Sequence, residues 1–390
     1  MQPPRLVTNR FHAPTRVGPT TQLPARFHQS LPGYRPTALV EAPHAARRLG
    51  VKHVHVKDES DRFDMPSFKV LGASWATYRA LLHHLGATSE EIPTLSALTE
   101  RLQGSNLCLC AATDGNHGRA VARMASMLGL QSKIIVPHDM VADRISAIEA
   151  EGATVLMIDG GYDDAVSHSA AQASETTLVV SDTSWDGYTD TPGWVVEGYS
   201  TMLAETRDQL AARGLATPTV IAAQVGVGAF AAAVARAFAR STGTHLVGVE
   251  PTEADCMTTS IEKGSITTIP GPQRSIMAGL NCGTPSLVAW PDVSAGYRTF
   301  VTITDDQVTT AMRLLAQDSI VSGESGAAGL GGLLAHAAAL GLSSTDSVLI
   351  ISTEGATDQA GYRALVGSDT TTGSDTTAAP AAGATAERTA

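Results

Sequence analysis

The chain has 390 residues, and a protein of this length usually folds as two or three domains. Apolar residues make up 43% and charged residues 17%, a composition that excludes a wholly disordered chain. The 27 basic and 38 acidic side chains give a formal charge of −11, which argues against nucleic acid and anionic membranes as partners. No apolar run reaches the about 18 residues that a membrane-spanning helix needs. The N-terminus lacks the apolar stretch of a secretory signal, so we expect none.

Four cysteines bear on compartment and metal binding: Cys108, Cys110, Cys256 and Cys282. None of them shows the CxxC spacing of a metal or redox motif. We interpret them as buried structural thiols in a reducing cytoplasm, and we expect no metal site.

The two ends of the chain differ from its middle. Residues 1–33 are rich in Pro and Arg and predict an extended or partly disordered arm that adds no core. Residues 367–390 repeat GSDTT and contain no large apolar residue, which predicts a disordered tail.

Between these ends, short apolar runs alternate with helix-like runs. The predicted strands cover 51–59, 107–112, 133–137, 154–159, 177–182, 219–225, 245–250 and 347–353. The predicted helices cover 118–128, 143–151, 162–174, 194–213, 229–240, 306–317 and 327–339. This alternation predicts an α/β fold with mostly parallel sheets. Ligands in such folds bind beyond the carboxyl ends of the strands, so the residues after each strand are the candidates for a site.

After the first strand, Ser67-Phe68-Lys69 opens a predicted helix. Lys69 is either a surface lysine or an amine in an apolar setting. In the second case its pKa would fall, and the amine could form a Schiff base.

Two further strands lead into glycine-containing turns that precede helices. The turn Thr113-Asp114-Gly115-Asn116-His117-Gly118 is richer in polar residues than a simple helix cap requires. The turn Gly226-Val227-Gly228-Ala229 suits a phosphate monoester, because it lacks the third glycine of a dinucleotide fingerprint and the lysine of a P-loop. Glycines here could also serve close packing alone.

Two other strand ends carry polar groups. Asp182 begins the segment DTSWDGY, in which two acids, a Trp and a Tyr make a site more plausible than a solvated turn. Ser352 and Thr353 place a hydroxyl where it can donate to a ring nitrogen.

These pieces occur together in an order that resembles fold-type II pyridoxal-phosphate enzymes, the group of threonine dehydratase, cysteine synthase and the tryptophan synthase β chain. Five blocks are similar to the diaminopropionate ammonia-lyase branch: KDESDRFDMPSFKVLGAS, ATDGNHGRAVA, DTSWDGYTDTPGWVVEGYSTM, GESGAAG and ISTEGATD. Ordinary threonine dehydratases have Ser in place of Asp114 and lack the DTSWDGY block. The resemblance covers roughly residues 29–365.

The resemblance implies a fold and a division into domains. It implies two open, twisted, mostly parallel sheets flanked by helices, with a smaller lobe inserted in a larger one. We expect residues 34–105 and 206–366 to form the large pyridoxal-phosphate domain and residues 106–205 the small inserted domain. A homodimer is also implied.

The resemblance carries roles over by position. Lys69 would hold the cofactor through its amine, and Asn116 would hydrogen-bond the ring hydroxyl. Thr353, or else Ser352, would face the pyridine nitrogen. The phosphate would lie on the backbone of Gly226, Val227, Gly228, Ala229 and Phe230.

Asp114 and Asp182 match the two aspartates that act in this family as bases for opposite enantiomers, Asp114 for D and Asp182 for L. A base working near neutral pH is expected to have a raised pKa, which a closed, partly apolar pocket supplies. The residues expected to contact the substrate are Ser67, Thr113, His117 and Tyr188.

The implied activity is α,β-elimination of D- or L-2,3-diaminopropionate to pyruvate and two ammonia by way of aminoacrylate. A hydroxyl at the ring nitrogen makes the ring a milder electron sink than a carboxylate would, which suits elimination. The alternatives are a serine or threonine dehydratase, a β-replacement enzyme of a specialised pathway, and a non-catalytic homologue that binds a ligand. Ala229, Ala356 and Asp64 replace the usual Ser, Asp and Gly and leave room for an altered substrate.

Overall fold

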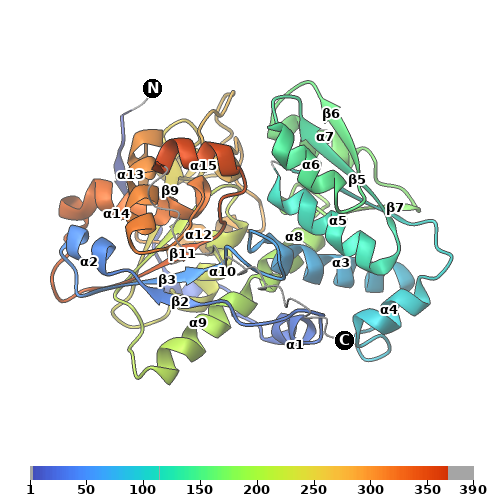
Figure 1. Cartoon of the computed structure of the whole chain (residues 1–390), viewed down its shortest axis with the longest axis horizontal. Coiled ribbons are helices and arrows are strands. Elements are labelled where there is room, and N and C mark those ends of the chain that lie inside the picture. Colours follow the sequence, from blue (N-terminus) through green and yellow to red (C-terminus); the bar gives the residue numbers. More distant parts are fainter. Residues whose placement is uncertain (1–2, 114, 368–390) are drawn as a thin grey trace, which may run out of the picture.

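The computed structural model describes residues 3–113 and 115–367. Figure 1 shows two lobes, each built around its own sheet. The blue N-terminal and orange C-terminal parts form the larger lobe, and the green middle of the chain forms the smaller one. The chain leaves the larger lobe, builds the smaller lobe and returns, which confirms the predicted fold class with an inserted lobe.

The larger lobe contains a seven-stranded sheet in the order β1-β10-β9-β8-β11-β3-β2. Its five inner strands are parallel, and the two edge strands are antiparallel to their neighbours. The strands are β1 (Leu6–Thr8), β2 (Leu39–Glu41), β3 (His53–Asp58), β8 (Val220–Gln224), β9 (His245–Pro251), β10 (Thr299–Ile303) and β11 (Ser347–Ser352). Every residue of β8 is buried, as expected for a parallel strand covered on both faces.

Helices cover both faces of this sheet and close two hydrophobic cores. One face packs on α2 (Pro43–Leu49), α13 (Asp305–Gln317) and α14 (Glu324–Leu340). The other face packs on α10 (Ala229–Phe238), with α9 (Ser200–Ala212) and α12 (Trp290–Gly296) beside it. The remaining elements of this part are α1 (Leu23–Gln29), α11 (Cys256–Lys263), α15 (Gln359–Val366) and the 3₁₀ turns η1 (Pro14–Arg16) and η2 (Ala278–Leu280).

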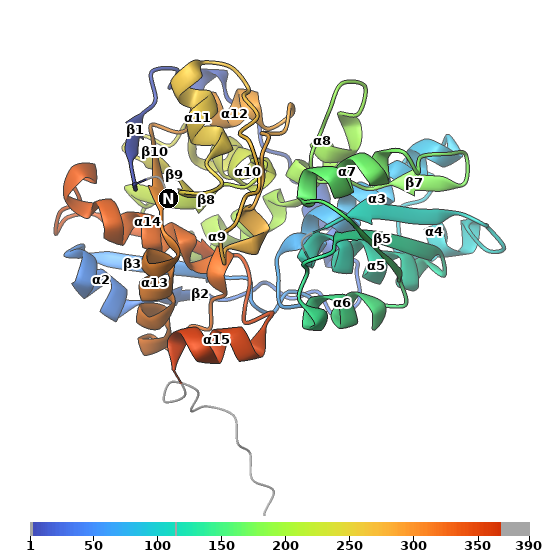
Figure 2. The ribbon, with the colours of Figure 1, turned by 90° about the horizontal axis from the view of Figure 1, so that it is seen from above.

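The smaller lobe contains a four-stranded, all-parallel sheet in the order β6-β5-β4-β7. Its strands are β4 (Cys108–Ala112), β5 (Gln131–Pro137), β6 (Thr154–Ile158) and β7 (Thr177–Val179). Figure 2 shows α5 (Asn116–Leu128) and α6 (Ala142–Glu149) on one side of this sheet and α7 (Tyr162–Ala170) on the other.

Two helices that precede the predicted small domain pack beside its sheet. The helix α3 (Lys69–Leu85) lies against α5 and α8 (Asp190–Gly198), and α4 (Leu95–Arg101) also contacts α5. Both helices fall within 34–105, the segment expected in the large domain. The sequence could not show this, because the side of a lobe on which a helix packs depends on contacts far away in the chain.

The N-terminal segment of the chain also differs from the prediction. The segment 1–33 is not an arm without core, because β1 pairs with β10 and the side chains of Phe27 and Leu31 are buried in the larger core. Of the predicted tail, residues 368–390 lie outside the described residues.

The predicted helix 194–213 is two helices, α8 and α9, which meet at Tyr199. Throughout the described ranges, no helix is both long and apolar enough to cross a membrane. None of the four cysteines forms a disulfide within the described residues; Cys110, Cys256 and Cys282 are buried and Cys108 is partly exposed.

Candidate active site

The polar segments that follow the strands meet at one pocket between the lobes. The larger lobe contributes Gly226–Phe230 between β8 and α10, and Thr353 and Glu354 after β11. The start of α3 contributes Ser67–Lys69, and the start of α5 contributes Asn116. The pocket therefore lies beyond the carboxyl ends of parallel strands, where the fold class predicts a ligand.

Lys69 and Asp182 form an ion pair in this pocket. Lys69 is the first residue of α3, and its Nζ lies 2.5 Å from Oδ2 of the buried Asp182. Tyr162, the first residue of α7, donates its hydroxyl to Oδ1 of Asp182 at 2.8 Å. Lys69 is therefore not the surface lysine of the alternative interpretation, since it carries its amine into the pocket.

The charge state of Asp182 differs from our expectation. Burial by itself raises the pKa of Asp182, but the Lys69 ammonium, His117 and the Tyr162 hydroxyl outweigh burial and hold the pKa well below its ordinary value. The prediction of a raised pKa was wrong for Asp182, because the sequence did not reveal that these donors would converge on its carboxylate. Asp182 is ionised at neutral pH and can accept a proton. Asp114, the other predicted base, lies outside the described residues.

His117 lies near this ion pair and is not among the residues that line the pocket. Its Nε2 is 2.8 Å from the carbonyl oxygen of Val180, which only accepts hydrogen bonds, so Nε2 carries a proton. Its Nδ1 lies 4.0 Å from Oδ2 of Asp182. His117 also helps to lower the pKa of Asp182.

The turn Gly226–Phe230 has the geometry of an anion site. Gly228 has φ of +102°, a left-handed backbone that glycine adopts without strain. The helix α10 begins at Ala229, directly after this turn, and the first amides of a helix have no carbonyl partner within it. These amides, together with the helix dipole, favour a phosphate at the start of α10.

Asn116 and Thr353 complete the set of polar groups. The Nδ2 of Asn116 donates to Oε2 of Glu354 at 2.5 Å, and the other oxygen of Glu354 accepts from the backbone N–H of Ser325 at 3.0 Å. Thr353 lines the pocket, whereas the Oγ of Ser352 is hydrogen-bonded to the Oγ of Ser322 at 2.7 Å and is fully buried. Of the two hydroxyls weighed for the ring nitrogen, only Thr353 reaches the pocket.

The residues present fit pyridoxal phosphate. Lys69 offers an amine for the aldehyde, and the start of α10 offers amides for the phosphate. Asn116 and Thr353 offer an amide and a hydroxyl for the ring substituents.

Among the four residues expected to contact substrate, only Ser67 lines the pocket. The Oγ1 of Thr113 accepts from the backbone N–H groups of Gly115 and Gly118, at 2.8 and 2.9 Å, so it holds the turn before α5. The hydroxyl of Tyr188 donates to the carbonyl of Val179 at 2.7 Å and accepts from the N–H of Ser181. The side chains of Thr113, His117 and Tyr188 hold their own segments and do not line the pocket, so their contact with substrate stays a prediction.

Several pocket residues were missed from the sequence, among them the polar side chains of Tyr162, Gln224 and Glu354. Gln224 gave a usable signal, since it is a polar residue at the end of an otherwise apolar strand. Tyr162 follows the predicted strand 154–159 and begins the predicted helix 162–174, but it belongs to none of the five blocks that carry the resemblance.

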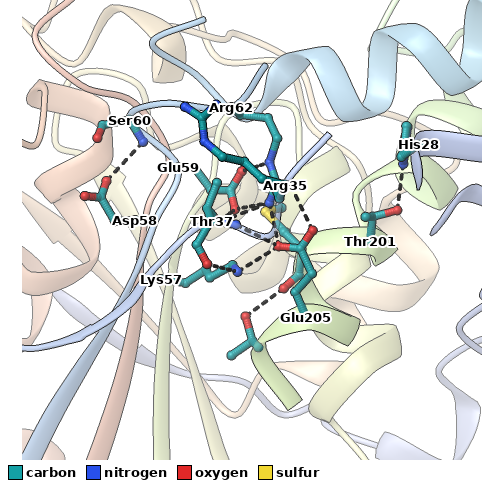
Figure 3. Close-up of polar contacts among 12 residues, drawn as sticks. His28, Arg35, Thr37, Lys57, Asp58, Glu59, Ser60, Arg62, Thr201 and Glu205 are labelled. Carbon is teal, nitrogen blue, oxygen red and sulfur yellow. Dashed lines mark hydrogen bonds and ion pairs between the residues drawn. The ribbon is translucent and has the colours of Figure 1, made fainter. Parts of the chain in front are cut away.

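A buried cluster of charged residues anchors the loop that carries Lys69 (Figure 3). We name it the Arg62 cluster, and it consists of Thr37, Lys57, Glu59, Arg62 and Glu205. The Arg62 guanidinium binds Glu59 at 2.7 Å and Glu205 at 2.7 and 2.8 Å, and Lys57 binds Glu205 at 2.8 Å. Two cations thus balance two anions, which a buried charged group requires.

The same loop explains one departure from the family pattern. Phe63 and Asp64 have φ of 56° and 57°, in the left-handed region. A glycine at position 64, as in the pattern that the chain resembles, would adopt this backbone without strain, and Asp is among the few other residues that tolerate it.

Comparisons with known proteins agree with this site. The profile of the family described as "Pyridoxal-phosphate dependent enzyme" matches residues 30–354. The diaminopropionate ammonia-lyase of Escherichia coli strain K12 is 38% identical over 368 residues, which cover 88% of this chain and 90% of that protein. A crystal structure of the Escherichia coli enzyme in complex with D-serine superposes with a TM-score of 0.86 and 34% identity, covering 93% of this chain and 97% of that chain. The same enzyme in complex with an aminoacrylate–PLP azomethine intermediate gives a TM-score of 0.85 and 35% identity, covering 94% and 97%.

Proposed function

This chain belongs to the diaminopropionate ammonia-lyase family of pyridoxal-phosphate-dependent enzymes, and on that premise we propose that it eliminates ammonia from 2,3-diaminopropionate. The α-proton and the β-amine leave, and the aminoacrylate that forms reacts with water to give pyruvate and a second ammonia. The observation that carries the proposal is the ion pair of Lys69 and Asp182 in a pocket that also contains the start of α10.

When bound, pyridoxal phosphate withdraws electrons from Cα of the amino acid and so stabilises the negative charge left by the proton. Lys69 would hold the cofactor, and the amides of residues 226–230 would bind its phosphate. Asn116 would meet the ring hydroxyl and Thr353 the ring nitrogen.

The protein's own groups move the protons. Asp182, which lies in the pocket beside Lys69, takes the α-proton of the L isomer. Asp114 takes the α-proton of the D isomer. Lys69 then gives a proton to the departing β-amine, so that neutral ammonia leaves rather than an amide ion.

The test of the reaction is a substrate panel. The purified protein, incubated with pyridoxal phosphate, should show the visible absorption of the bound cofactor and release pyruvate from D- or L-diaminopropionate. Lys69→Ala should lose the absorption, and Lys133→Ala, a lysine of β5 outside the pocket, should keep it. Faster pyruvate release from serine or threonine would instead support a dehydratase.

The test of the two bases is stereochemical. We expect Asp182→Asn to slow turnover of the L isomer about 100-fold or more and Asp114→Asn to do the same for the D isomer, since a positioned base contributes that much. Asp186→Asn, at an exposed position of the same DTSWDGY segment, is the control. Equal losses on both isomers in both variants would rule out this assignment.

Compartment and assembly complete the proposal. Four cysteines without a disulfide among the described residues favour a reducing compartment, and we place the enzyme in the cytoplasm. We propose a homodimer, as the family resemblance implies, and sedimentation of the purified protein tests it.

A further inference from the structure

Gln224 is a buried pocket residue to which the proposed reaction gives no role. It is buried at the end of β8 with 3% of its surface exposed, and it lines the pocket next to Thr353. Its Oε1 has no hydrogen-bond partner within the part of the chain that the structure describes. A buried acceptor without a partner costs free energy of folding. We therefore expect the NH₂ group of the same amide to have a role that offsets this cost.

The orientation of the Gln224 amide follows from its neighbours. One end of the amide lies 3.1 Å from the carbonyl oxygen of Ile351, which only accepts hydrogen bonds. That end must therefore be the donor, Nε2. The same Nε2 lies 2.6 Å from Oγ1 of Thr353, so its second hydrogen is donated to that hydroxyl.

This bond fixes the direction of the Thr353 hydroxyl. An oxygen that accepts from Gln224 must direct its own single proton elsewhere. Among the described residues, Gln224 is the only partner recorded for this oxygen, and Thr353 lines the pocket. The proton of Thr353 is thereby available to a ligand in the pocket.

We infer that Gln224 is a positioning residue that makes Thr353 a hydrogen-bond donor toward the cofactor's ring nitrogen, which keeps that nitrogen neutral. This inference rests on the proposed function, because it concerns the same cofactor. If Gln224 were absent, the Thr353 hydroxyl would lose the donor that fixes its direction, and its proton could turn away from the ring nitrogen. The ring nitrogen would then lose its hydrogen bond, and the electron demand of the ring would change.

The experiment uses the full-length protein loaded with pyridoxal phosphate labelled with ¹⁵N in the ring, and reads the ¹⁵N chemical shift of that nitrogen. Thr353→Val removes the hydroxyl, so its spectrum gives the reference ¹⁵N chemical shift of a ring nitrogen that lacks this donor. Gln224→Met removes the amide at similar length, and Gln224→Glu offers an acceptor that would draw the Thr353 proton out of the pocket. Gln359→Met is the matched control, because Gln359 is exposed, donates to the carbonyl of Ala356 and lies outside the pocket.

We expect the wild-type signal to be that of a neutral, hydrogen-bonded nitrogen. Both Gln224 variants should move it in the same direction as Thr353→Val, with about tenfold loss of kcat/KM, the effect of one hydrogen bond. The double variant Gln224→Met/Thr353→Val should lose no more than Thr353→Val alone, since the two residues act through one bond.

The inference is overturned if the Gln224 variants keep the wild-type shift while Thr353→Val changes it, or if the wild-type nitrogen is protonated. If Gln224→Met does not fold, Gln224→Glu, whose side chain has the shape of the wild-type side chain, tests the inference by the same ¹⁵N chemical shift. A wild-type protein without cofactor absorption would overturn the proposed function itself, which separates the two failures.

Discussion

Glu250 on β9 links the stability of the larger lobe to pH at the scale of a single residue. Its carboxyl is fully buried and accepts hydrogen bonds from the backbone N–H groups of Met257 and Thr258, at 2.8 and 2.7 Å. Burial raises the pKa of Glu250 to about 8, although these hydrogen bonds lower it. The folded protein therefore keeps a proton that the unfolded chain releases.

This difference predicts a pH dependence. Between the ordinary pKa of 4.5 and about 8, the folded state binds more protons than the unfolded state, so the free energy of unfolding falls as the pH rises. Glu250→Gln cannot lose a proton, so its urea midpoint should fall less between pH 5.5 and pH 8.5 than that of the wild type. Glu253→Gln, at an exposed position, is the control and should follow the wild type. Parallel curves for Glu250→Gln and the wild type would contradict this reading of Glu250.

Single residues also mark how far the sequence predicts the site. Lys69, Asn116 and Thr353 were found because each follows a strand within a recognisable block. Tyr162 reaches Asp182 from a separate helix, and the lowered pKa of Asp182 depends on Lys69, which is 113 residues away in the chain. Such convergence is a property of the folded chain and leaves no local pattern.

At the scale of elements, the contact between α3 and α8 sets the position of Lys69. A Cβ added at Gly198 of α8 would lie 2.4 Å from the carbonyl oxygen of Leu71 in α3, closer than atoms approach without displacement. Only a glycine allows the two helices to lie this close, and Lys69 is the first residue of the helix that would have to move.

We therefore expect Gly198→Ala to destabilise the protein by about 1–3 kcal/mol, the usual cost of overpacking, and to weaken the cofactor absorption. Gly193→Ala in the same helix meets no atom within 4 Å and should be neutral or slightly stabilising, since Ala favours helix. Thermal unfolding of both variants measures the difference. Equal melting temperatures would show that the contact is not tight.

Element length explains part of what the sequence predicts of the fold. The buried strands β8 and β11 were predicted within one residue at each end. The predicted starts of β3 and β5 are two residues off, and the five-residue strand β10 was not predicted. The edge strands β1 and β2 have three residues each, too few for any periodicity to stand out. The break between α8 and α9 was missed because Tyr199 keeps a helical backbone, with φ of −67° and ψ of −14°.

At the scale of the whole molecule, the pocket joins the lobes. The inserted segment contributes Asn116, Tyr162 and Asp182, and the larger lobe contributes Thr353 and the turn before α10. A ligand that touches both sides stabilises their arrangement, because it binds the folded state and not the unfolded chain.

Removal of the cofactor should therefore lower the unfolding temperature of the whole protein. Pyridoxal phosphate restored at 100 times its Kd should return about 2.7 kcal/mol of stability. Differential scanning calorimetry of both forms measures this change, with inorganic phosphate at the same concentration as the control. An unfolding temperature unaffected by the cofactor would contradict the idea that it joins the lobes.

The Arg62 cluster bears on how a two-lobed protein of this kind can evolve. Arg62 and Glu205 are 143 residues apart in sequence, yet their side chains lie 2.7 Å apart where the chain leaves and re-enters the larger lobe. The segment between Arg62 and Glu205 therefore begins and ends at neighbouring points of the larger lobe. This geometry permits one domain to be inserted into another. A smaller lobe of different shape, with a different substrate range, could replace this one by recombination, provided that both ends of the cluster were kept.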